Sequence, residues 1–429
     1  MAVLLIGTLD TKGAETAFVR DRLRAAGVPV AVLDAGVLGP PAFAPDIPRE
    51  RVFAAAGAVY AEVKAAGDRG RAVTLAAAGA AELALHLFRD GKLAGVLGLG
   101  GSAGTTIATA AMRALPVGVP KLVVSTLASG QVGPFVGTRD VMMLHSVVDI
   151  AGLNRISRAV LGNAAAAMAG MVAAGLVLEA RTGVSQVGGS ALSFPPGESG
   201  RGPDDKPIIA ATMFGVTTPC VEAARAVLEE TGYEVLVFHA TGTGGKTMEG
   251  LIRDGLVAGV LDITTTELAD ELAGGILSAG PDRLTAAGAA GIPQLISVGA
   301  LDMVNFGPPE TVPTRYADRR FYRHNANVTL MRTTPEENAA LGAELARKAA
   351  AARGPTVVAL PLRGVSAIDA DGKPFWWPEA DATLFAAVRA GRGAGAELLE
   401  RDEHINDPAF AAACARSLLA MLAGRRAAP

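Results

Sequence analysis

Short apolar runs that end in glycine or small polar residues alternate with amphipathic stretches along most of this chain. This alternation constrains the fold more than any other feature. Residues 2–8 (AVLLIGT) form an apolar run, residues 12–27 have helical spacing and end at a glycine, and residues 28–36 form the next apolar run. Such runs are typical of strands buried on both faces of a parallel sheet, with helices as the crossover connections. The pattern therefore predicts an α/β protein.

The alternation is interrupted at residues 182–206, a stretch rich in Gly, Ser, Pro and Asp, and then resumes. A chain of 429 residues is too long for a single core, so two domains of roughly 200 residues each are expected. We predict two Rossmann-like subdomains, residues 1–181 and 207–429, joined by a linker at 182–206. Each is a mainly parallel sheet flanked by helices, and we expect a cleft between the two.

The same patterns predict individual elements. In the first half, helices are predicted over residues 51–67 and 80–91. In the second half, strands are expected within residues 207–215, 233–245, 257–265, 293–299, 327–333 and 356–364, and a last helix over 407–424.

Charge and cysteine content exclude several classes of protein. The formal net charge is −3 and no block of lysine and arginine occurs, which argues against electrostatically driven nucleic-acid binding. The two cysteines form no CxxC pair, which fits a reducing compartment. The N-terminal apolar run lacks a basic region and a cleavage motif, so we interpret it as a first strand. We expect a cytoplasmic protein that binds neither nucleic acid nor a membrane.

A glycine-rich turn, GLGGSAGTT, occupies residues 98–106 between a predicted strand and a predicted helix. Backbone N–H groups at a helix N-terminus attract phosphates, and Ser102 and Thr105 would add hydroxyl groups. Gly98, Gly100 and Ala103 satisfy the dinucleotide pattern G-x-G-x-x-G/A. That pattern also needs an acidic residue about 20 positions later, and residues 117–124 contain none. The turn thus favours a phosphate over NAD, the alternative being a tight turn with a helix cap.

A second polar segment, TLDTKG, follows the first strand at residues 8–13. Asp10 can hold Mg²⁺ or a ribose hydroxyl, and Lys12 can neutralise a phosphate. The alternative for both is helix capping and a solvated charge. Because ligands in open α/β sheets bind beyond the carboxyl ends of the strands, we expect this segment and the glycine-rich turn to lie at one edge.

In the second half, ATGTGGKT at residues 240–247 resembles the phosphate-binding Walker motif but begins with Ala240 where the motif has glycine. Asp262 would be the corresponding magnesium carboxylate. A different polar ligand pocket and a capped turn are the alternatives. Three residues near this loop, His239, Lys246 and Glu267, are the candidate catalytic group.

Other polar residues are weaker candidates. Glu267 and Glu271, with Asp270 beside them, form an acid/base or metal cluster or a solvated first helical turn. Cys220 is a candidate nucleophile at a helix N-terminus. The FWWP segment at residues 375–378 lines a ligand or an oligomer contact. His324 opens another polar segment. No HxH or HExxH occurs, so no metal site is predicted.

Taken together, several long blocks resemble one family. They are GTLDTKGAE, GLGGSAGTT, GTRDVMMLHSVVDIAGLNRISRAVLGNAA, MFGVTTPCVEAAR, VFHATGTGGKTMEGLI, LDITTTELADELAGG and HNANVTLMRTT. The family is that of uncharacterised bacterial proteins related to the N-terminal ATP-binding domain of the tomato mosaic virus resistance protein. The resemblance implies two Rossmann-like subdomains, ATP binding and a homodimer. By matching blocks, it places eight residues in a nucleotide pocket of the first subdomain: Asp10, Thr11, Lys12, Gly100, Gly101, Ser102, Gly104 and Thr105.

We therefore expect an ATP-binding cytoplasmic protein, with Mg²⁺ as a candidate companion ion. The leading interpretation is an enzyme that acts on a small metabolite held against His239, Lys246 and Glu267 in the cleft. The alternative is a nucleotide-binding regulator or protein-interaction domain without turnover. An NAD-linked oxidoreductase is disfavoured by the missing acidic residue. The competing loop at 240–247 leaves open which half binds the nucleotide.

Overall fold

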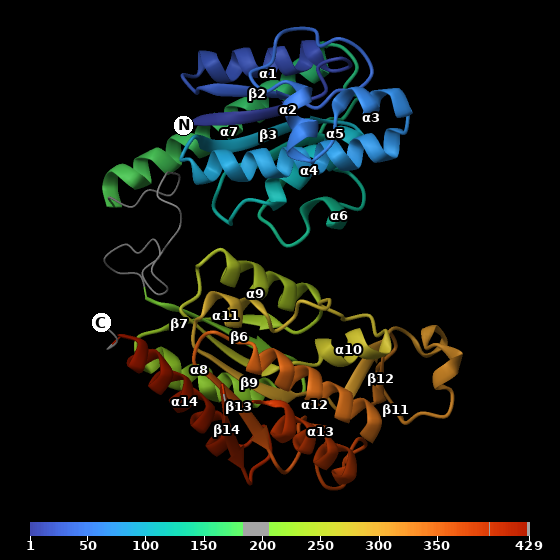
Figure 1. The fold of residues 1–429 in the computed structure, drawn as a ribbon, viewed down its shortest axis with the longest axis vertical. Helices are drawn as coiled ribbons and strands as arrows, with labels where there is room; N and C mark the ends of the chain where they lie inside the picture. The colour runs from blue at the N-terminus through green and yellow to red at the C-terminus, as the bar shows by residue number, and fades with distance from the viewer. Residues whose placement is uncertain (183–205, 394, 427–429) are drawn as a thin grey trace. The chain divides into compact units, whose positions relative to one another are not determined.

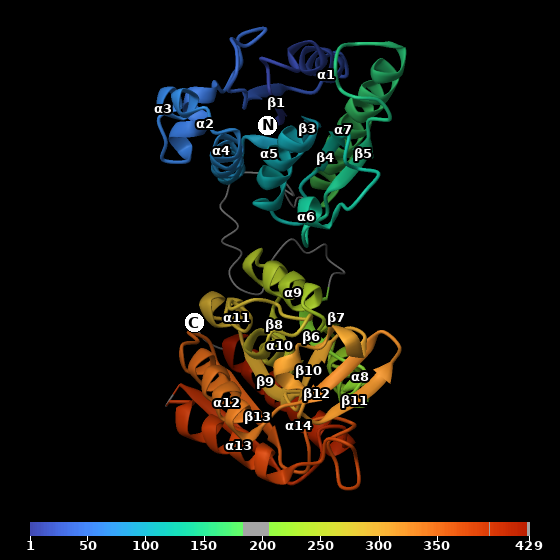
Figure 2. The ribbon, with the colours of Figure 1, turned by 90° about the vertical axis from the view of Figure 1, so that its right-hand side faces the viewer.

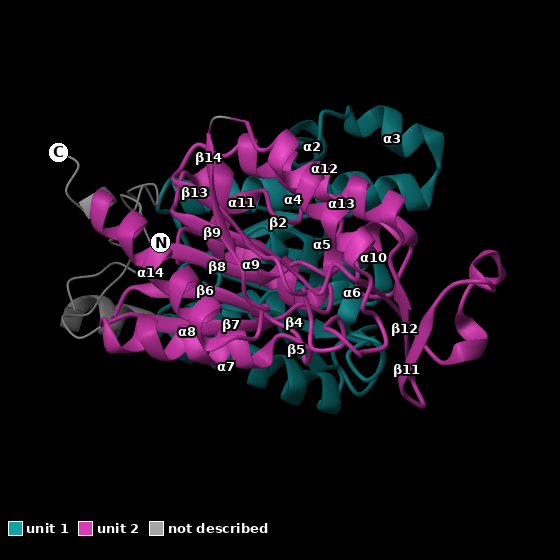
Figure 3. Cartoon of the chain, turned by 90° about the horizontal axis from the view of Figure 1, so that it is seen from below, with its two compact units in different colours: residues 1–193 teal, residues 194–429 magenta. Residues whose placement is uncertain are grey.

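The computed structural model describes residues 1–182, 206–393 and 395–426 (Figure 1). The chain divides into two compact units, Met1–Ser193 (unit 1) and Phe194–Pro429 (unit 2), which Figure 3 colours separately. The linker predicted at 182–206 falls almost entirely on residues 183–205, outside the described residues. That linker and the expected cleft stay predictions.

Unit 1 is built on a five-stranded parallel sheet with the strand order β2-β1-β3-β4-β5. The strands are β1 (Ala2–Gly7), β2 (Val30–Asp34), β3 (Leu93–Gly100), β4 (Lys121–Ser125) and β5 (Met142–His145). The helices are α1 (Gly13–Ala25), α2 (Arg49–Ala55), α3 (Tyr60–Ala66), α4 (Arg69–Arg89), α5 (Ser102–Arg113), α6 (Gly133–Val136) and α7 (Arg155–Thr182).

Side chains of the unit 1 sheet alternate between two buried faces. Leu4 and Ile6 point to a core formed with α2, α4 and α5. Val3 and Leu5 point to a second core formed with α1 and α7. Figure 2 shows α4 and α5 on the opposite side of the strands from α1. Because both faces are covered, the strands are apolar throughout, as the sequence pattern predicts.

Unit 2 contains a six-stranded parallel sheet with the order β14-β13-β9-β8-β6-β7, and a three-stranded antiparallel sheet with the order β10-β12-β11. The strands are β6 (Ile208–Met213), β7 (Glu234–His239), β8 (Gly259–Thr264), β9 (Gln294–Gly299), β10 (Met303–Phe306), β11 (Phe321–Asn325), β12 (Val328–Arg332), β13 (Thr356–Pro361) and β14 (Ala396–Arg401). The α-helices are α8 (Thr218–Glu230), α9 (Thr243–Arg253), α10 (Glu267–Ala273), α11 (Ala286–Ala290), α12 (Pro335–Ala350), α13 (Pro378–Gly391) and α14 (Pro408–Arg426).

The predicted fold class is confirmed, since both main sheets are parallel and flanked by helices. The strand expected at 327–333 is confirmed as β12, which pairs antiparallel with β10 and β11 in the smaller sheet. One element prediction is wrong in detail. The helix expected over 51–67 is two helices, because Gly57 adopts a φ of +72° and ends the first of them.

Two helices, α4 and residues 155–174 of α7, are long and apolar enough to cross a membrane by length and composition. Both pack on the unit 1 sheet: Ala76 and Ala80 of α4 lie in one core, and Leu161 and Met168 of α7 lie in the other. These contacts bury part of each helix within the unit.

Arg283 is the centre of a buried ion-pair network in unit 2. Its side chain is 0% exposed, and its guanidinium donates to both oxygens of Asp262, at 2.6 and 2.7 Å, and to Glu267 at 2.6 Å. A third carboxylate, Glu249, lies 3.5 Å away. These acids come from β8, α10 and α9, so one arginine ties three elements together. Removing it would leave three buried carboxylates without their cation.

Arg332 at the end of β12 gathers a second buried cluster in unit 2. It donates to Asp381 at 2.7 Å and lies 3.4 Å from Asp369, while Ser366 donates to the nearby Asp302 at 2.8 Å. Burial, reinforced by the Asp369 carboxylate and opposed by Arg332, raises the pKa of Asp302 to about 8. Burial and Asp369 likewise raise the pKa of Asp381 to about 7. One cation does not balance three acids, so protons stay on the cluster near neutral pH.

We predict that Arg283→Met lowers the free energy of unfolding of unit 2 by about 3–5 kcal/mol, the usual cost of stranding buried charges. Both tryptophans, Trp376 and Trp377, lie in unit 2, so tryptophan fluorescence during urea denaturation reports this unit alone. The matched control is Arg363→Met. Arg363 pairs with Asp402 on the surface, where their side chains are 64% and 74% exposed, and we expect no measurable change. Equal losses in the two variants would contradict the assigned role of Arg283.

We also predict that unit 2 becomes less stable as pH rises from 5 to 9. The folded pKa of Asp302 lies above the ordinary value of 3.8, so the native state keeps a proton that the unfolded chain has lost. For each such proton, the free energy of unfolding falls by up to about 1.4 kcal/mol for every unit by which the pH rises. Asp302→Asn stays neutral and can still accept from Ser366, so its urea midpoint should depend less on pH. Asp402→Asn is the control, and an unchanged pH dependence in Asp302→Asn would refute this assignment.

Candidate functional site

The strand order of unit 1 reverses between β1 and β3, which are neighbours in the sheet. The helix after β1, α1, lies on one face, and the helix after β3, α5, lies on the other. The loops that follow these two strands therefore diverge. A crevice at such a point, outside the carboxyl ends of the strands, is where open α/β sheets bind ligands.

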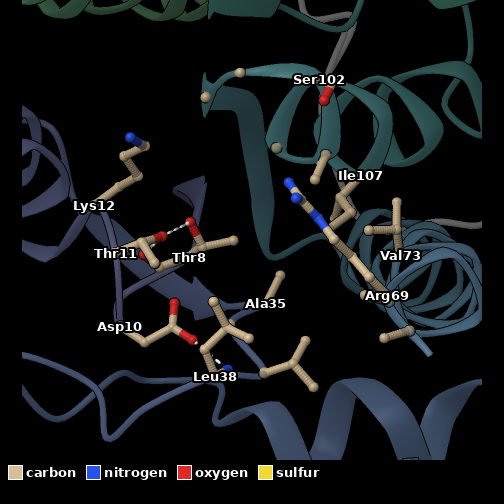
Figure 4. A pocket seen from close by; sticks show the side chains of 18 of the residues that line it. Thr8, Asp10, Thr11, Lys12, Ala35, Leu38, Arg69, Val73, Ser102 and Ile107 are labelled. Atoms are coloured by element: carbon tan, nitrogen blue, oxygen red, sulfur yellow. Dashed lines mark hydrogen bonds between the residues drawn. The ribbon is translucent and has the colours of Figure 1, made fainter. Parts of the chain in front are cut away.

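A pocket of about 500 Å³ lies at this point (Figure 4). Its lining comes from the loops after β1, β2 and β3, from α3, α4 and α5, and from one residue beyond β5. The lining residues are Thr8, Asp10, Thr11, Lys12, Ala35, Gly36, Val37, Leu38, Val63, Lys64, Gly67, Asp68, Arg69, Ala72, Val73, Ala76, Gly100, Gly101, Ser102, Ala103, Gly104, Ile107 and Asp149. Seven of the eight residues predicted for a nucleotide pocket are in this set, and the eighth, Thr105, is not.

One end of the pocket is formed by the N-terminus of α5. Gly101 is the N-cap residue and no side chain caps the helix, so the N–H groups of its first turn have no acceptor within the helix. Two cationic side chains of the lining lie near this end in Figure 4: Lys12 after β1 and Arg69 at the start of α4. Lys12 also donates to the backbone oxygen of Ile150. This end of the pocket offers hydrogen-bond donors and positive charge.

The glycines of this turn also have a packing role. A Cβ on Gly100 would lie 2.8 Å from the Cα of Gly104, and one on Gly104 would lie 2.9 Å from the backbone oxygen of Leu99. Thr105 is fully buried and its hydroxyl pairs with that of Ser125 at 2.7 Å. These contacts hold α5 close to β3 and β4. Thr105 thus supports the turn from behind and does not line the pocket.

Asp10 forms an acidic part of the pocket. Its side chain is 2% exposed, and one carboxylate oxygen, Oδ2, accepts from the backbone N–H groups of Leu38 at 2.7 Å and Gly39 at 3.3 Å. Arg49, which pairs with Asp34 at 2.6 Å, lies 3.9 Å from the same oxygen. The loops after β1 and β2 are therefore joined through buried charges. Sequence patterns did not predict this role of Arg49, because its partner Asp34 is 15 residues away in the chain.

The remaining wall is apolar. It consists of Ala35, Val37, Leu38, Val63, Ala72, Val73, Ala76 and Ile107. Leu38 is 77% exposed, an unusual position for a large apolar side chain in a chain with a well-packed core. Sequence reasoning did not identify this wall or Arg69, because most of these residues come from the loop and helices between β2 and β3, which carry no ligand-binding motif.

The loop of unit 2 that resembles a Walker motif is arranged differently. Glu267 is 1% exposed and lies beneath this loop, where it accepts from the N–H groups of Gly242 at 2.7 Å and Gly245 at 3.1 Å. Burial raises the pKa of Glu267, while Arg283 and Gly242 oppose the shift. Asp262 is likewise bonded to Arg283 and to Thr212. A protein carboxylate therefore takes two of the amides that a phosphate would need.

The other members of the predicted catalytic group lie elsewhere around this loop. His239 at the end of β7 and Lys246 on α9 are both exposed. Glu267 is engaged with Arg283 and the loop backbone, so the structure gives it a positioning contact and no open face toward the other two. Catalytic roles for His239 and Lys246 stay predictions.

The weaker candidates are mostly interior residues. Cys220 is fully buried, and burial raises its pKa to about 12, which contradicts a nucleophilic thiolate. Asp270 accepts from Asn305 at 2.7 Å, and burial raises its pKa to about 7. Glu271 accepts from Ser278, and His324 is exposed on β11. Within the described residues, no group of three or more His, Cys, Asp or Glu side chains is placed to hold a metal ion.

The FWWP segment also belongs to unit 2. Phe375 is buried in a small core with Val216 and Met303. Arg320 lies over the Trp377 ring, 5.1 Å from its centroid, and donates to the backbone oxygen of Trp376 at 3.2 Å. These contacts attach the segment to Arg320, the residue before β11. Figure 3 shows β11 extending from the main sheet of unit 2.

Comparisons with known proteins identify the family. Residues 1–176 match the model described as Uncharacterised protein family (UPF0261) N-terminal domain, and residues 206–422 match the corresponding C-terminal domain. Among solved structures, a Streptomyces sp. SF2575 glycosyltransferase, SsfS6, aligns with 99% of this chain and 96% of its own at 15% identity. The TM-score is 0.17, too low to carry an argument.

Three relatives illustrate the range of similar proteins. A UPF0261 protein of Clostridium tetani is 45% identical over 424 residues, 98% of each chain. A UPF0261 protein of Rhizobium meliloti is 46% identical over 413 residues, 96% of each chain. The ToMV resistance protein Tm-1(GCR237) of Solanum lycopersicum is 44% identical over 350 residues, which cover 79% of this chain and 43% of that protein. The two domain matches and the full-length relatives show that this chain belongs to the UPF0261 family.

Proposed function

We propose that unit 1 binds ATP in the pocket between the loops after β1 and β3. The observation that carries this proposal is the position of the uncapped N-terminus of α5 at the point where the strand order reverses, in a pocket that also holds Asp10 and an apolar wall. Each feature alone is common in α/β proteins. Their combination in one pocket matches the three chemical parts of a nucleotide.

The phosphates would bind at the N-terminus of α5. Unpaired N–H groups and the positive end of the helix dipole favour an anion there. Ser102 is exposed at the first position of the helix and offers its hydroxyl group. Lys12 and Arg69 supply positive charge, and no ion pair of Arg69 is found among the described residues. Mg²⁺ that accompanies ATP would be held by the phosphates and by Asp149, an exposed carboxylate of the lining.

The adenine would lie against the apolar wall. Val37, Leu38, Val63 and Val73 provide a surface for a flat ring, and a volume of about 500 Å³ is within the range of small-molecule pockets. A ligand bound against this wall would cover the exposed side chain of Leu38. An ATP-binding chain of this kind acts as an ATP-dependent enzyme or as a nucleotide-sensing regulator. ATP turnover by the purified protein would distinguish these two roles.

We predict that Ser102→Glu abolishes ATP binding without loss of the fold. A glutamate in the first turn of α5 favours the helix but repels a phosphate. At 100 times its dissociation constant, ATP should stabilise the wild type by about 2.7 kcal/mol, seen as a raised unfolding temperature with ATP and Mg²⁺. Ser102→Gln, which has the same size without the charge, should keep much of this shift.

Two outcomes of the same assay would contradict the proposal. One is that ATP leaves the unfolding temperature of the wild type unchanged. The other is that Lys246→Ala abolishes the shift while Ser102→Glu retains it, which would place the nucleotide at the loop before α9 in unit 2.

A further inference from the structure

Asp10 carries an acceptor that the protein itself does not satisfy. Oδ2 is bonded to the backbone of Leu38 and Gly39, but Oδ1 is buried and has no hydrogen-bond partner among the described residues. Figure 4 shows one Asp10 oxygen directed to Leu38 and the other on the side of Thr8 and Thr11, which also line the pocket. A buried acceptor without a donor is costly, so a pocket that keeps one is shaped for a ligand that donates.

The surroundings of Asp10 limit what this donor can be. The carboxylate repels phosphate oxygens, and the donors of α5, Lys12 and Arg69 belong to the other end of the pocket. Gly36 lies so close that a Cβ there would be 2.5 Å from Oδ1. A ligand atom must therefore reach Oδ1 from a side other than that of Gly36, and a small neutral donor such as a hydroxyl group fits this position.

A metal ion fits this position less well. Magnesium and calcium need about six oxygen ligands, and no cluster of three candidate ligand residues occurs in the described part of the chain. A cation is also already present beside Asp10, because the Arg49 guanidinium, which pairs with Asp34, lies 3.9 Å from Oδ2. A hydroxyl group satisfies Oδ1 without adding further charge to this buried site.

We propose that Asp10 Oδ1 accepts a hydrogen bond from a ribose hydroxyl, so the pocket selects ribonucleotides over deoxyribonucleotides. This inference rests on the proposed nucleotide site. It makes Asp10 the residue that determines sugar specificity, a role separate from phosphate binding at α5. It also explains why the loops after β1 and β2 are joined through Leu38 and Gly39, since that contact fixes which carboxylate oxygen faces the ligand.

The test measures the affinity of the full chain for ATP, 2′-deoxy-ATP and 3′-deoxy-ATP by calorimetry. We expect the wild type to bind ATP at least about tenfold more tightly than one of the two deoxy analogues, because that analogue leaves Oδ1 unpaired. Asp10→Asn keeps an acceptor for Leu38 and Gly39 and places a neutral donor where the charged acceptor was. We expect it to reduce the preference for ATP by about tenfold.

Asp46→Asn is the matched control. Asp46 also accepts from a backbone N–H of unit 1, that of Val32 at 2.8 Å, but it does not line the pocket, so the sugar preference should be unchanged. If the wild type binds all three nucleotides equally, or if Asp10→Asn keeps the full preference, the role of Asp10 is wrong while ATP binding stands. If the wild type binds none of them, the proposed function fails together with this inference.

Discussion

In each unit all strands of the main sheet run parallel, so every strand delivers the loop that follows it to the same edge of the sheet. In unit 1 the strand order reverses between β1 and β3, and their helices, α1 and α5, lie on opposite faces. The two loops therefore separate, and the space between them must be filled by side chains or by a ligand. The location of the pocket follows from this reversal.

Unit 2 has the same reversal between β6 and β8 but fills that position with its own side chains. The hydroxyl groups of Thr217 and Thr264 pair at 2.8 Å, and Thr212 donates to Asp262 at 2.6 Å. Glu267 occupies amides of the loop before α9 in the same way. Similar glycine-rich sequences thus have different roles: one loop faces a pocket, and the other wraps a buried carboxylate that Arg283 neutralises.

The alternation of apolar runs and helices was sufficient to predict the two parallel sheets. A strand that is buried on both faces is apolar along its whole length, and such runs are visible in the sequence. The segments 8–13 and 98–106 were identified for the same reason, since each follows a strand. The sequence did not reveal contacts between distant residues: Arg49 with Asp10, Arg69 beside the turn at α5, or Glu267 beneath Gly242 and Gly245. The strand at 327–333 was predicted, but the antiparallel pairing of β12 was not, because an apolar run is the same in a parallel and an antiparallel sheet. The glycine-rich loops of unit 1 and unit 2 looked alike in the sequence. Glu267, the side chain that fills the unit 2 loop, lies 25 residues after Gly242 in the chain.

Photoaffinity labelling with 8-azido-ATP would locate the nucleotide most directly. The azide sits on the base, so the labelled peptide, identified by mass spectrometry after digestion, reports what the adenine contacts. The label should appear within residues 35–76, which hold most of the apolar wall, and excess ATP should suppress it. Labelling of residues 239–253 in unit 2 would show that the nucleotide binds at the other loop and that the unit 1 pocket serves a different ligand.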